Sequence, residues 1–187
     1  MELRRLRLSD GPAWQRARRA AEQRLAGSFD QAGLSFSRST SLTAFADTWW
    51  SNRHEVRAGR YVPFVAIRDH GDVVGELAFV IDPRTGVAEA SLWADQSLSP
   101  GATTWIAAAG LLRMLALPQG VVGILAPVAV DNPGPARLLQ QFGFEHRGLA
   151  RQLRRHHGQV VDHDVWWLEP DERHLARLGA MVAAQLA

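Results

Sequence analysis

The chain has 187 residues, of which 47% are hydrophobic and 21% are charged, and its formal net charge is +2. This length suits one domain with a full core, and the composition is ordinary for a globular protein. With no Cys, the chain excludes disulfides, thiolate zinc sites and cysteine nucleophiles. All 21 basic residues are Arg, which excludes lysine Schiff-base chemistry. No apolar run approaches about 18 residues, so we expect no membrane span and a cytoplasmic location.

The N-terminal third predicts a strand and two helices. Residues 3–8 alternate as in a strand, and Ser9 to Pro12 resemble a helix start with a first-turn proline, for a helix to about Leu25. Residues 27–40 are polar and predict a loop. A second helix is predicted over 41–58, with a buried stripe formed by Leu42, Phe45, Trp49 and Val56.

The rest of the chain predicts most of a sheet. Apolar runs separated by turn residues predict strands at 61–68, 73–81 and 87–94, followed by a helix at 103–115 and a strand at 121–130. A helix from 132, strands at 144–155 and 159–168, and a C-terminal helix at 171–186 complete the order. This order is typical of an α+β protein with a mixed sheet, in one domain that spans residues 1–187.

The thirteen residues 132–144 form the most informative segment. They read Asn-Pro-Gly-Pro-Ala-Arg-Leu-Leu-Gln-Gln-Phe-Gly-Phe and follow an apolar strand. Asn132 is a good N-cap, and prolines are tolerated in a first helical turn. Gly143 stands where a left-handed C-cap is expected. One apolar face is formed by Leu138, Leu139 and Phe142.

This segment resembles the Asn-x-x-Ser-x-x-x-Leu-x-x-x-Gly-Phe stretch of the GNAT acyltransferases, and most closely that of their Rim-type ribosomal-protein branch. The match includes Asn132, Leu139, Gly143 and Phe144, whereas Pro135 replaces the usual Ser. The resemblance covers about residues 3–168. It implies a twisted mixed sheet of about seven strands flanked by helices, with acetyl-CoA or another acyl-CoA as co-substrate.

The resemblance also implies positions for the co-substrate. The family's pyrophosphate loop matches Ser99 to Trp105, so Gly101, Ala102, Thr103 and Thr104 would hold the pyrophosphate; the usual leading Arg or Gln is missing. The strand Glu89-Ala90-Ser91-Leu92-Trp93 matches a Rim-type strand, which implies that Leu92, Trp93 and Ala94 contact pantetheine. Trp93 is expected to pack in the core as well. Asn132 would orient the thioester end of the co-substrate.

Glu89 is the candidate general base, because it interrupts a strand that is otherwise apolar or small. Partial burial would raise the pKa of such a carboxylate towards a useful range. A salt bridge to an Arg and a solvent-facing position are the alternative interpretations. Pro135 has no proton to give the leaving thiolate, which leaves the proton donor open.

Other clusters receive a structural interpretation. His156, His157, Asp162, His163 and Asp164 are close in sequence, but neighbouring strand residues point to opposite faces, so no metal site is expected. The arginines Arg147, Arg151, Arg154 and Arg155 are interpreted as a solvated strand face, with attraction of an acidic acceptor or CoA phosphates as the alternative. Trp14, Phe29, Trp49 and Trp50 are interpreted as core residues, and an acceptor pocket is the alternative.

The predicted reaction is direct acyl transfer to a primary amine of a protein N-terminus or a small molecule, in a ternary complex. Two alternatives remain open: a degenerate GNAT domain that serves as a CoA-binding or protein-interaction module, and an RNA- or ribosome-associated binder suggested by the arginine-rich strand alone. Nucleic acid is not an expected partner, since the net charge is small. A homodimer is possible, and the identity of the acceptor is left open.

Overall fold

The computed structural model describes residues 1–26, 28–29, 34–117, 120–156 and 158–184. Its strands are β1 (Glu2–Arg5), β2 (Tyr61–Ile67), β3 (Val73–Ile81), β4 (Val87–Ala94), β5 (Gly123–Ala129), β6 (Glu145–His156) and β7 (Gln159–Leu168). Its α-helices are α1 (Gly11–Ala20), α2 (Glu22–Leu25), α3 (Phe36–Ser39), α4 (Leu42–Ser51), α5 (Arg53–Arg57), α6 (Pro100–Leu115), α7 (Pro133–Phe142) and α8 (Glu172–Ala184).

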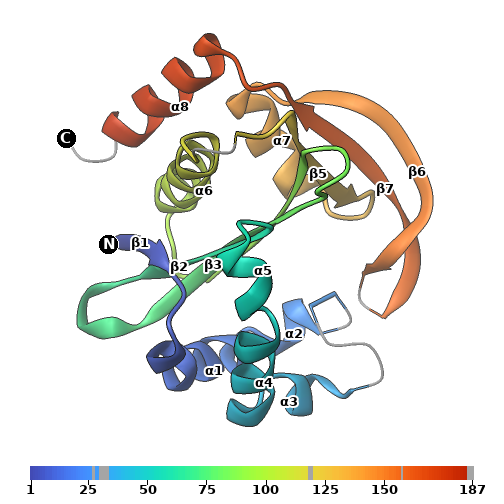
Figure 1. Ribbon diagram of the computed structural model, residues 1–187. Coiled ribbons are helices and arrows are strands. Elements are labelled where there is room, and N and C mark those ends of the chain that lie inside the picture. Colours follow the sequence, from blue (N-terminus) through green and yellow to red (C-terminus); the bar gives the residue numbers. More distant parts are fainter. Residues whose placement is uncertain (27, 30–33, 118–119, 157, 185–187) are drawn as a thin grey trace.

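The described strands form one seven-stranded sheet in the order β1-β2-β3-β4-β5-β7-β6. The pairing of β4 with β5 is parallel and every other pairing is antiparallel, so the sheet is mixed. Helices α6, α7 and α8 lie on one side of the sheet, and α1 to α5 lie on the other (Figure 1). These findings confirm the predicted α+β fold class and the C-terminal helix.

Two cores hold the layers together. The larger core lies under α6 and includes Phe79, Ile106 and Leu178, all of them fully buried. The smaller core lies under α1 and α4, and it is built around Trp14 and Phe45, whose ring centroids are 4.9 Å apart. Because β3 is covered on both faces over most of its length, its sequence is apolar almost throughout instead of alternating.

The predicted helix over 41–58 is interrupted, and its predicted buried stripe is wrong. The chain has a break at Asn52, so α4 and α5 are separate helices. Of the four stripe residues only Phe45 is buried, since Leu42 and Val56 are 45% and 37% exposed. Trp49 is half-buried and lines a cavity. The interaction of Phe45 with Trp14 decides which face of α4 turns inward.

The ends of several helices also differ between the prediction and the structure. The helix expected from 103 begins at Pro100, because the Ser99 hydroxyl accepts a hydrogen bond from the N–H of Ala102. The helix expected over 9–25 divides into α1 and α2. Parts of the predicted loop 27–40 and the end of the predicted C-terminal helix lie outside the described residues. In the described ranges, every helix is too short or too polar to cross a membrane.

The motif at 132–144 forms the predicted helix with one correction. Gly143 adopts a left-handed conformation, with φ of 94°, and ends α7 as expected. Phe142 is buried, with Leu138 and Leu139 packed against the larger core. Asn132 occupies the N-cap position, but its side chain makes no capping hydrogen bond to the helix.

Candidate active site

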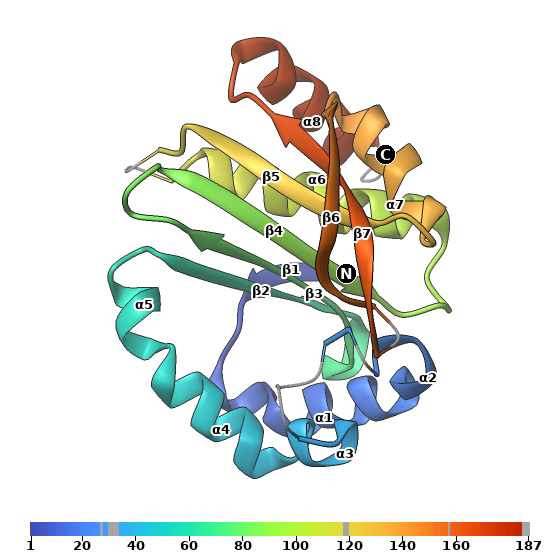
Figure 2. The same ribbon diagram turned by 90° about the vertical axis from the view of Figure 1, so that its right-hand side faces the viewer.

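The parallel strands β4 and β5 separate towards their C-terminal ends. They pair only over three residues of each strand, from Val87 with Gly123 to Glu89 with Leu125. Beyond Glu89, β4 continues to Ala94 along β3, while β5 continues along β7 (Figure 2). The edge of β4 from Ala90 to Ala94 therefore has no partner strand on its β5 side among the described residues. Backbone donors and acceptors on such an edge can pair with an extended ligand.

The helix that follows β4 begins at this opening. Pro100 has no N–H, the N–H of Ala102 donates to the Ser99 hydroxyl, and that of Thr103 donates to the Ser99 carbonyl. The N–H of Gly101 has no acceptor among the described residues. The first turn of α6 therefore retains a free donor at its positive end, a suitable position for an anion.

The hydroxyls of Thr103 and Thr104 are turned towards their own helix. Thr104 Oγ1 donates to the carbonyl of Pro100 over 2.9 Å, and Thr103 Oγ1 lies 3.4 Å from that of Ser99. Trp105 follows them, half-buried against the larger core, and its indole N–H is buried without a partner in the described chain. A ligand at this turn would therefore meet backbone groups first and would have to rotate the threonine side chains to use them.

Glu89 lies at the point where the two strands diverge. It is the last residue of β4 that pairs with β5, and its side chain is 28% exposed. Both of its carboxylate oxygens accept hydrogen bonds from the guanidinium of Arg154 on β6, one of them over 2.6 Å. The salt bridge foreseen as an alternative is present, and whether Glu89 also acts as a base stays a prediction.

A second close contact brings β6 to the other side of the opening. His156 lies two residues after Arg154, and its Nδ1 is 2.8 Å from the carboxylate of Asp131 at the end of β5. One strand thus contacts both β4 and the segment that leads into α7. The β6–β7 hairpin lies across the divergence of β4 and β5, on the same side of the sheet as α1 (Figure 2).

The arginines of β6 are exposed, as the interpretation of a solvated strand face expects, but they do not lie on one continuous face of the strand. Register shifts between His146 and Gly148, and between Ala150 and Arg154, interrupt the alternation of the strand. Gln152 has a φ of 48° within the second shift. Such bulges re-aim side chains. Here Arg147 pairs with Glu145, while the guanidinium of Arg155 donates to the Gly158 carbonyl.

The histidines of the hairpin make separate contacts. His146 is paired with Asp164, and the ring of buried His163 contacts the carbonyl of Val161. Asp162 accepts from the N–H of Gln152. His157 lies outside the described residues.

An aromatic cavity of about 410 Å³ lies between α1, α4 and the sheet. Its lining includes the buried residues Trp14, Arg18 and Phe45 and the half-buried residues Trp49 and Tyr61. Three of the four aromatic residues considered for an acceptor pocket line it, namely Trp14, Phe29 and Trp49. Trp50 is outside the lining and 55% exposed. Trp14 and Phe29 therefore belong to the smaller core and also line the cavity.

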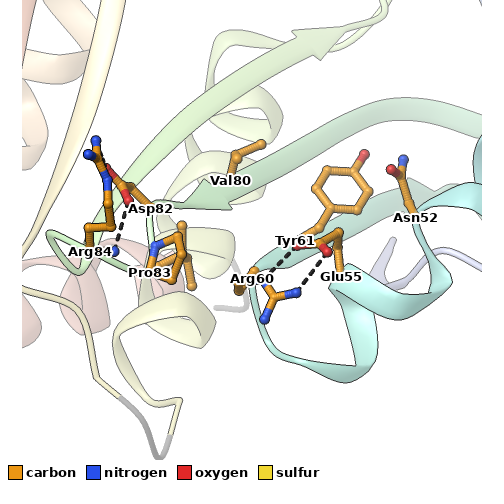
Figure 3. A pocket seen from close by; sticks show the side chains of 9 residues that line it. Asn52, Glu55, Arg60, Tyr61, Val80, Asp82, Pro83 and Arg84 are labelled. Atoms are coloured by element: carbon orange, nitrogen blue, oxygen red, sulfur yellow. Dashed lines mark hydrogen bonds and ion pairs between the residues drawn. The ribbon is translucent and has the colours of Figure 1, made fainter.

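A more polar recess of about 610 Å³ adjoins the aromatic cavity and shares Asn52 and Tyr61 with it. Figure 3 shows the Arg60 guanidinium bound to the Glu55 carboxylate below Tyr61, with Asp82 and Arg84 on one side of Tyr61 and Asn52 on the other. Burial and the nearby charge of Glu76 raise the pKa of Tyr61, with Arg18 opposing them, so its hydroxyl stays protonated.

Glu76 is the site residue that the sequence interpretation missed. It lies on β3 opposite Trp93, and its Oε2 accepts hydrogen bonds from the indole N–H groups of Trp14 and Trp93 over 3.1 and 2.9 Å. The available signal was the one that identified Glu89, a single acid in an apolar strand. Trp93 itself is buried as expected, and Leu92 packs against the larger core.

No protein-family model and no curated protein matches the sequence. Solved structures do match. Mycobacterium smegmatis RimJ, in complex with CoA-disulfide, has 27% identity and a TM-score of 0.83 over 95% of this chain and 87% of its own. A ribosomal-protein alanine acetyltransferase from Vibrio fischeri has 16% identity and a TM-score of 0.79, with 91% and 93% covered. A variant of the spermidine N-acetyltransferase SpeG from Vibrio cholerae has 16% identity and a TM-score of 0.73, with 95% and 99% covered.

Proposed function

Because the chain belongs to the GNAT superfamily and is similar to its Rim-type branch, we propose that it is an acyl-CoA-dependent N-acyltransferase acting on a primary amine. The observation that carries the proposal is the divergence of β4 and β5 beyond Glu89, with a helix N-terminus and the start of α7 beside it. The similarity to a RimJ in complex with CoA-disulfide supports an acyl-CoA, with acetyl as the expected acyl group.

The residues of the opening fit the parts of an acyl-CoA. The free edge of β4 at Leu92, Trp93 and Ala94 offers backbone groups to the amide-containing pantetheine arm. The free N–H of Gly101 and the dipole of the sixteen-residue helix α6 suit the pyrophosphate. Ala102, Thr103 and Thr104 belong to the same turn, and Asn132 begins α7 near the end of β5.

When bound, the acyl-CoA supplies a thioester as the acyl donor. The amine nitrogen bonds to the acyl carbon, the carbon–sulfur bond breaks, and the proton lost by the amine goes to Glu89, directly or through water. Pro135 has no proton to donate, so the sulfur leaving group takes its proton from water. Arg154 must release the Glu89 carboxylate before that carboxylate accepts a proton.

The structure supports the type of reaction more directly than it supports any one class of acceptor. A primary amine of a protein N-terminus or of a small molecule fits the proposal, because a fold does not determine its substrate. A cytoplasmic location and a homodimer stay predictions of the same hypothesis.

Isothermal titration with acetyl-CoA tests the proposal first. We expect one-to-one binding at micromolar concentration, followed by thiol release when primary amines are added. Gly101→Asp places a carboxylate at the proposed pyrophosphate position and should weaken binding. Ser97→Asp is the matched control, since it adds the same charge in the preceding exposed turn.

The competing function is that of a degenerate module that binds CoA or a protein without turnover. Two observations favour it: the first turn of α6 has little free donor capacity, and Glu89 is held by Arg154. Binding of acetyl-CoA with no transfer to any amine would support the CoA-binding module. No binding up to millimolar concentration would support the protein-interaction module and contradict the enzyme proposal.

A further inference from the structure

The salt bridge between Arg154 and Glu89 occupies the carboxylate that the proposed chemistry needs. Both carboxylate oxygens of Glu89 accept hydrogen bonds from the Arg154 guanidinium, in a bidentate arrangement. The two side chains are 50% and 28% exposed, so solvent reaches the ion pair. Ion pairs of this kind contribute little to stability, because water and dissolved ions compete for both partners. A ligand that carries its own carboxylate can therefore replace Glu89 on Arg154.

An irregular segment of β6 holds Arg154 in this position. The register of the strand shifts between Ala150 and Arg154. Within the shift, Gln152 has a φ of 48°, a backbone conformation that is costly for a residue other than glycine. The N–H of Gln152 donates to the carboxylate of Asp162 over 2.8 Å, which supports that conformation. Such bulges are frequent beside active sites, where they re-aim a side chain, and this one directs Arg154 towards β4.

The phosphates of an acyl-CoA do not fit as the partner of Arg154. In the proposed complex they lie at the first turn of α6, which follows the end of β4 at Ala94. Glu89 is five residues before Ala94, which is about 17 Å along an extended strand. The acceptor is therefore the substrate that can bring an anion to Arg154 beside Glu89.

An amine that also carries a carboxylate matches this ion pair charge for charge. Its ammonium group pairs with Glu89, and its carboxylate binds Arg154 in the same bidentate geometry. A simple amine, by contrast, has to separate the two side chains and leaves the guanidinium without a counter-charge. Since Arg154 and Glu89 are in direct contact, the two groups of the ligand have to be a few ångströms apart. Val80, which pairs with Glu89 on β3, is 57% exposed, so the sheet face beside the ion pair is open to a ligand.

We propose that Arg154 is a specificity-determining residue, which binds a carboxylate of the acceptor and thereby releases Glu89 for proton transfer. The favoured acceptor is a primary amine with a carboxylate a few ångströms from its nitrogen, as in a short amino acid or in a polypeptide that begins with an acidic residue. This inference rests on the proposed function for the transfer itself. In that step the amine nitrogen bonds to the acyl carbon and its proton goes to Glu89, while the acceptor carboxylate is unchanged. The binding of that carboxylate to Arg154 does not need acyl transfer.

Two pairs of acceptors test this inference on the whole protein. 4-Aminobutanoate and 4-aminobutanamide have the same amine and the same chain and differ only in the carboxylate. The tetrapeptide amides Asp-Ala-Ala-Ala and Asn-Ala-Ala-Ala make the same comparison at a polypeptide N-terminus. Arg154→Gln removes the guanidinium and should fold, because its ion pair is exposed. Arg147→Gln removes the same charge from β6 at a position paired with Glu145, and it is the matched control.

With acetyl-CoA present, we expect thiol release by the wild type to have a kcat/KM about fivefold or more higher for the acidic member of at least one pair. The pair that shows this preference identifies a free amino acid or a polypeptide as the source of the acceptor. Arg154→Gln should bring the ratio to about one by raising KM for the acidic member, with its kcat unchanged, whereas Arg147→Gln should keep the ratio. A wild-type ratio near one for both pairs, or a ratio that Arg154→Gln leaves intact, overturns the inference.

Saturation-transfer NMR with the same acceptors, in the absence of acyl-CoA, separates the two hypotheses. Preferential binding of the acidic member that is lost in Arg154→Gln, without any thiol release, contradicts the proposed function and leaves the Arg154 site standing. Thiol release with both members of each pair at equal kcat/KM supports the enzyme and overturns the Arg154 site.

Discussion

Substitution of Glu89 by Gln tests the proposed chemistry at the point where β4 and β5 diverge. If Glu89 takes the proton of the reacting amine, Glu89→Gln should lower kcat by about 10²–10⁴-fold, the usual contribution of a general base. The affinity for acetyl-CoA should not change. The Glu89 and Arg154 side chains are 28% and 50% exposed. Loss of their salt bridge should therefore cost at most ~1 kcal/mol, or a Tm decrease of about 2–4 °C.

The assay needs variants that separate the carboxylate from its salt bridge. Steady-state thiol release gives kcat, and thermal unfolding gives the change in Tm. Arg154→Gln breaks the same salt bridge from β6 and leaves the Glu89 carboxylate in place. Glu145→Gln removes a carboxylate that is paired with Arg147 elsewhere on the same strand.

A catalytic Glu89 predicts that only Glu89→Gln loses turnover, because Arg154→Gln frees the carboxylate and Glu145→Gln is remote from it. Equal losses in Glu89→Gln and Arg154→Gln would show that the salt bridge, not the base, matters. Wild-type kcat in Glu89→Gln would refute the assignment altogether.

Three further predictions concern the co-substrate and the fold. Gly101→Asp should weaken acetyl-CoA binding about tenfold or more in calorimetry, because it places a negative charge beside the proposed pyrophosphate position; an unchanged Kd contradicts that position. Gly143→Ala should lower the free energy of unfolding by about 1–3 kcal/mol in urea denaturation, since φ is +94° and an added Cβ would lie 2.6 Å from the His174 ring; a neutral result would mean that α7 ends differently. Burial tends to raise the pKa of Asp10, but hydrogen bonds from Arg4 and from the N–H of Arg7 lower it overall. A lowered pKa means that the ionised Asp10 carboxylate stabilises the folded state. This contribution is present above the unfolded-state pKa of about 4 and is lost as the pH falls below that value. Asp10→Asn should therefore flatten the loss of stability below about pH 4, and an unchanged acid profile would contradict the ion pair's role.

The order of the elements could be predicted because most of it is local. Turn residues bound β3 and β4, and the predicted strands 73–81 and 87–94 match both strands at each end. Gly143 marks the end of α7 because few other residues adopt its backbone conformation. The break at Asn52 has no such signal, since residues 41–58 are compatible with one helix.

The residues of the candidate site could likewise be predicted only where the signal is local in the sequence. Glu89 could be identified because an isolated acid in an apolar strand is visible in the sequence. Glu76 carries the same signal, but its partners Trp14 and Trp93 are 62 and 17 residues away. Arg154 is 65 residues from Glu89, and a double register shift in β6 places it there. Periodicity along one strand contains no information about such pairs.

Strand register connects the fold to the proposed chemistry. A slip of one residue in β3 would turn Glu76 and Val80 to the α6 side and bury a carboxylate in the larger core. The register shift between β2 and β3 occurs at Ala66 and Ile67, beyond the row of Glu76, so Tyr61 and Val80 remain paired. In β6, the three residues between Ala150 and Arg154 lie opposite a single residue of β7, so both strands advance by an even number of residues and Arg154 stays on the face of Glu89. The irregularities of the sheet therefore lie where they preserve one continuous face from the aromatic cavity to the opening between β4 and β5.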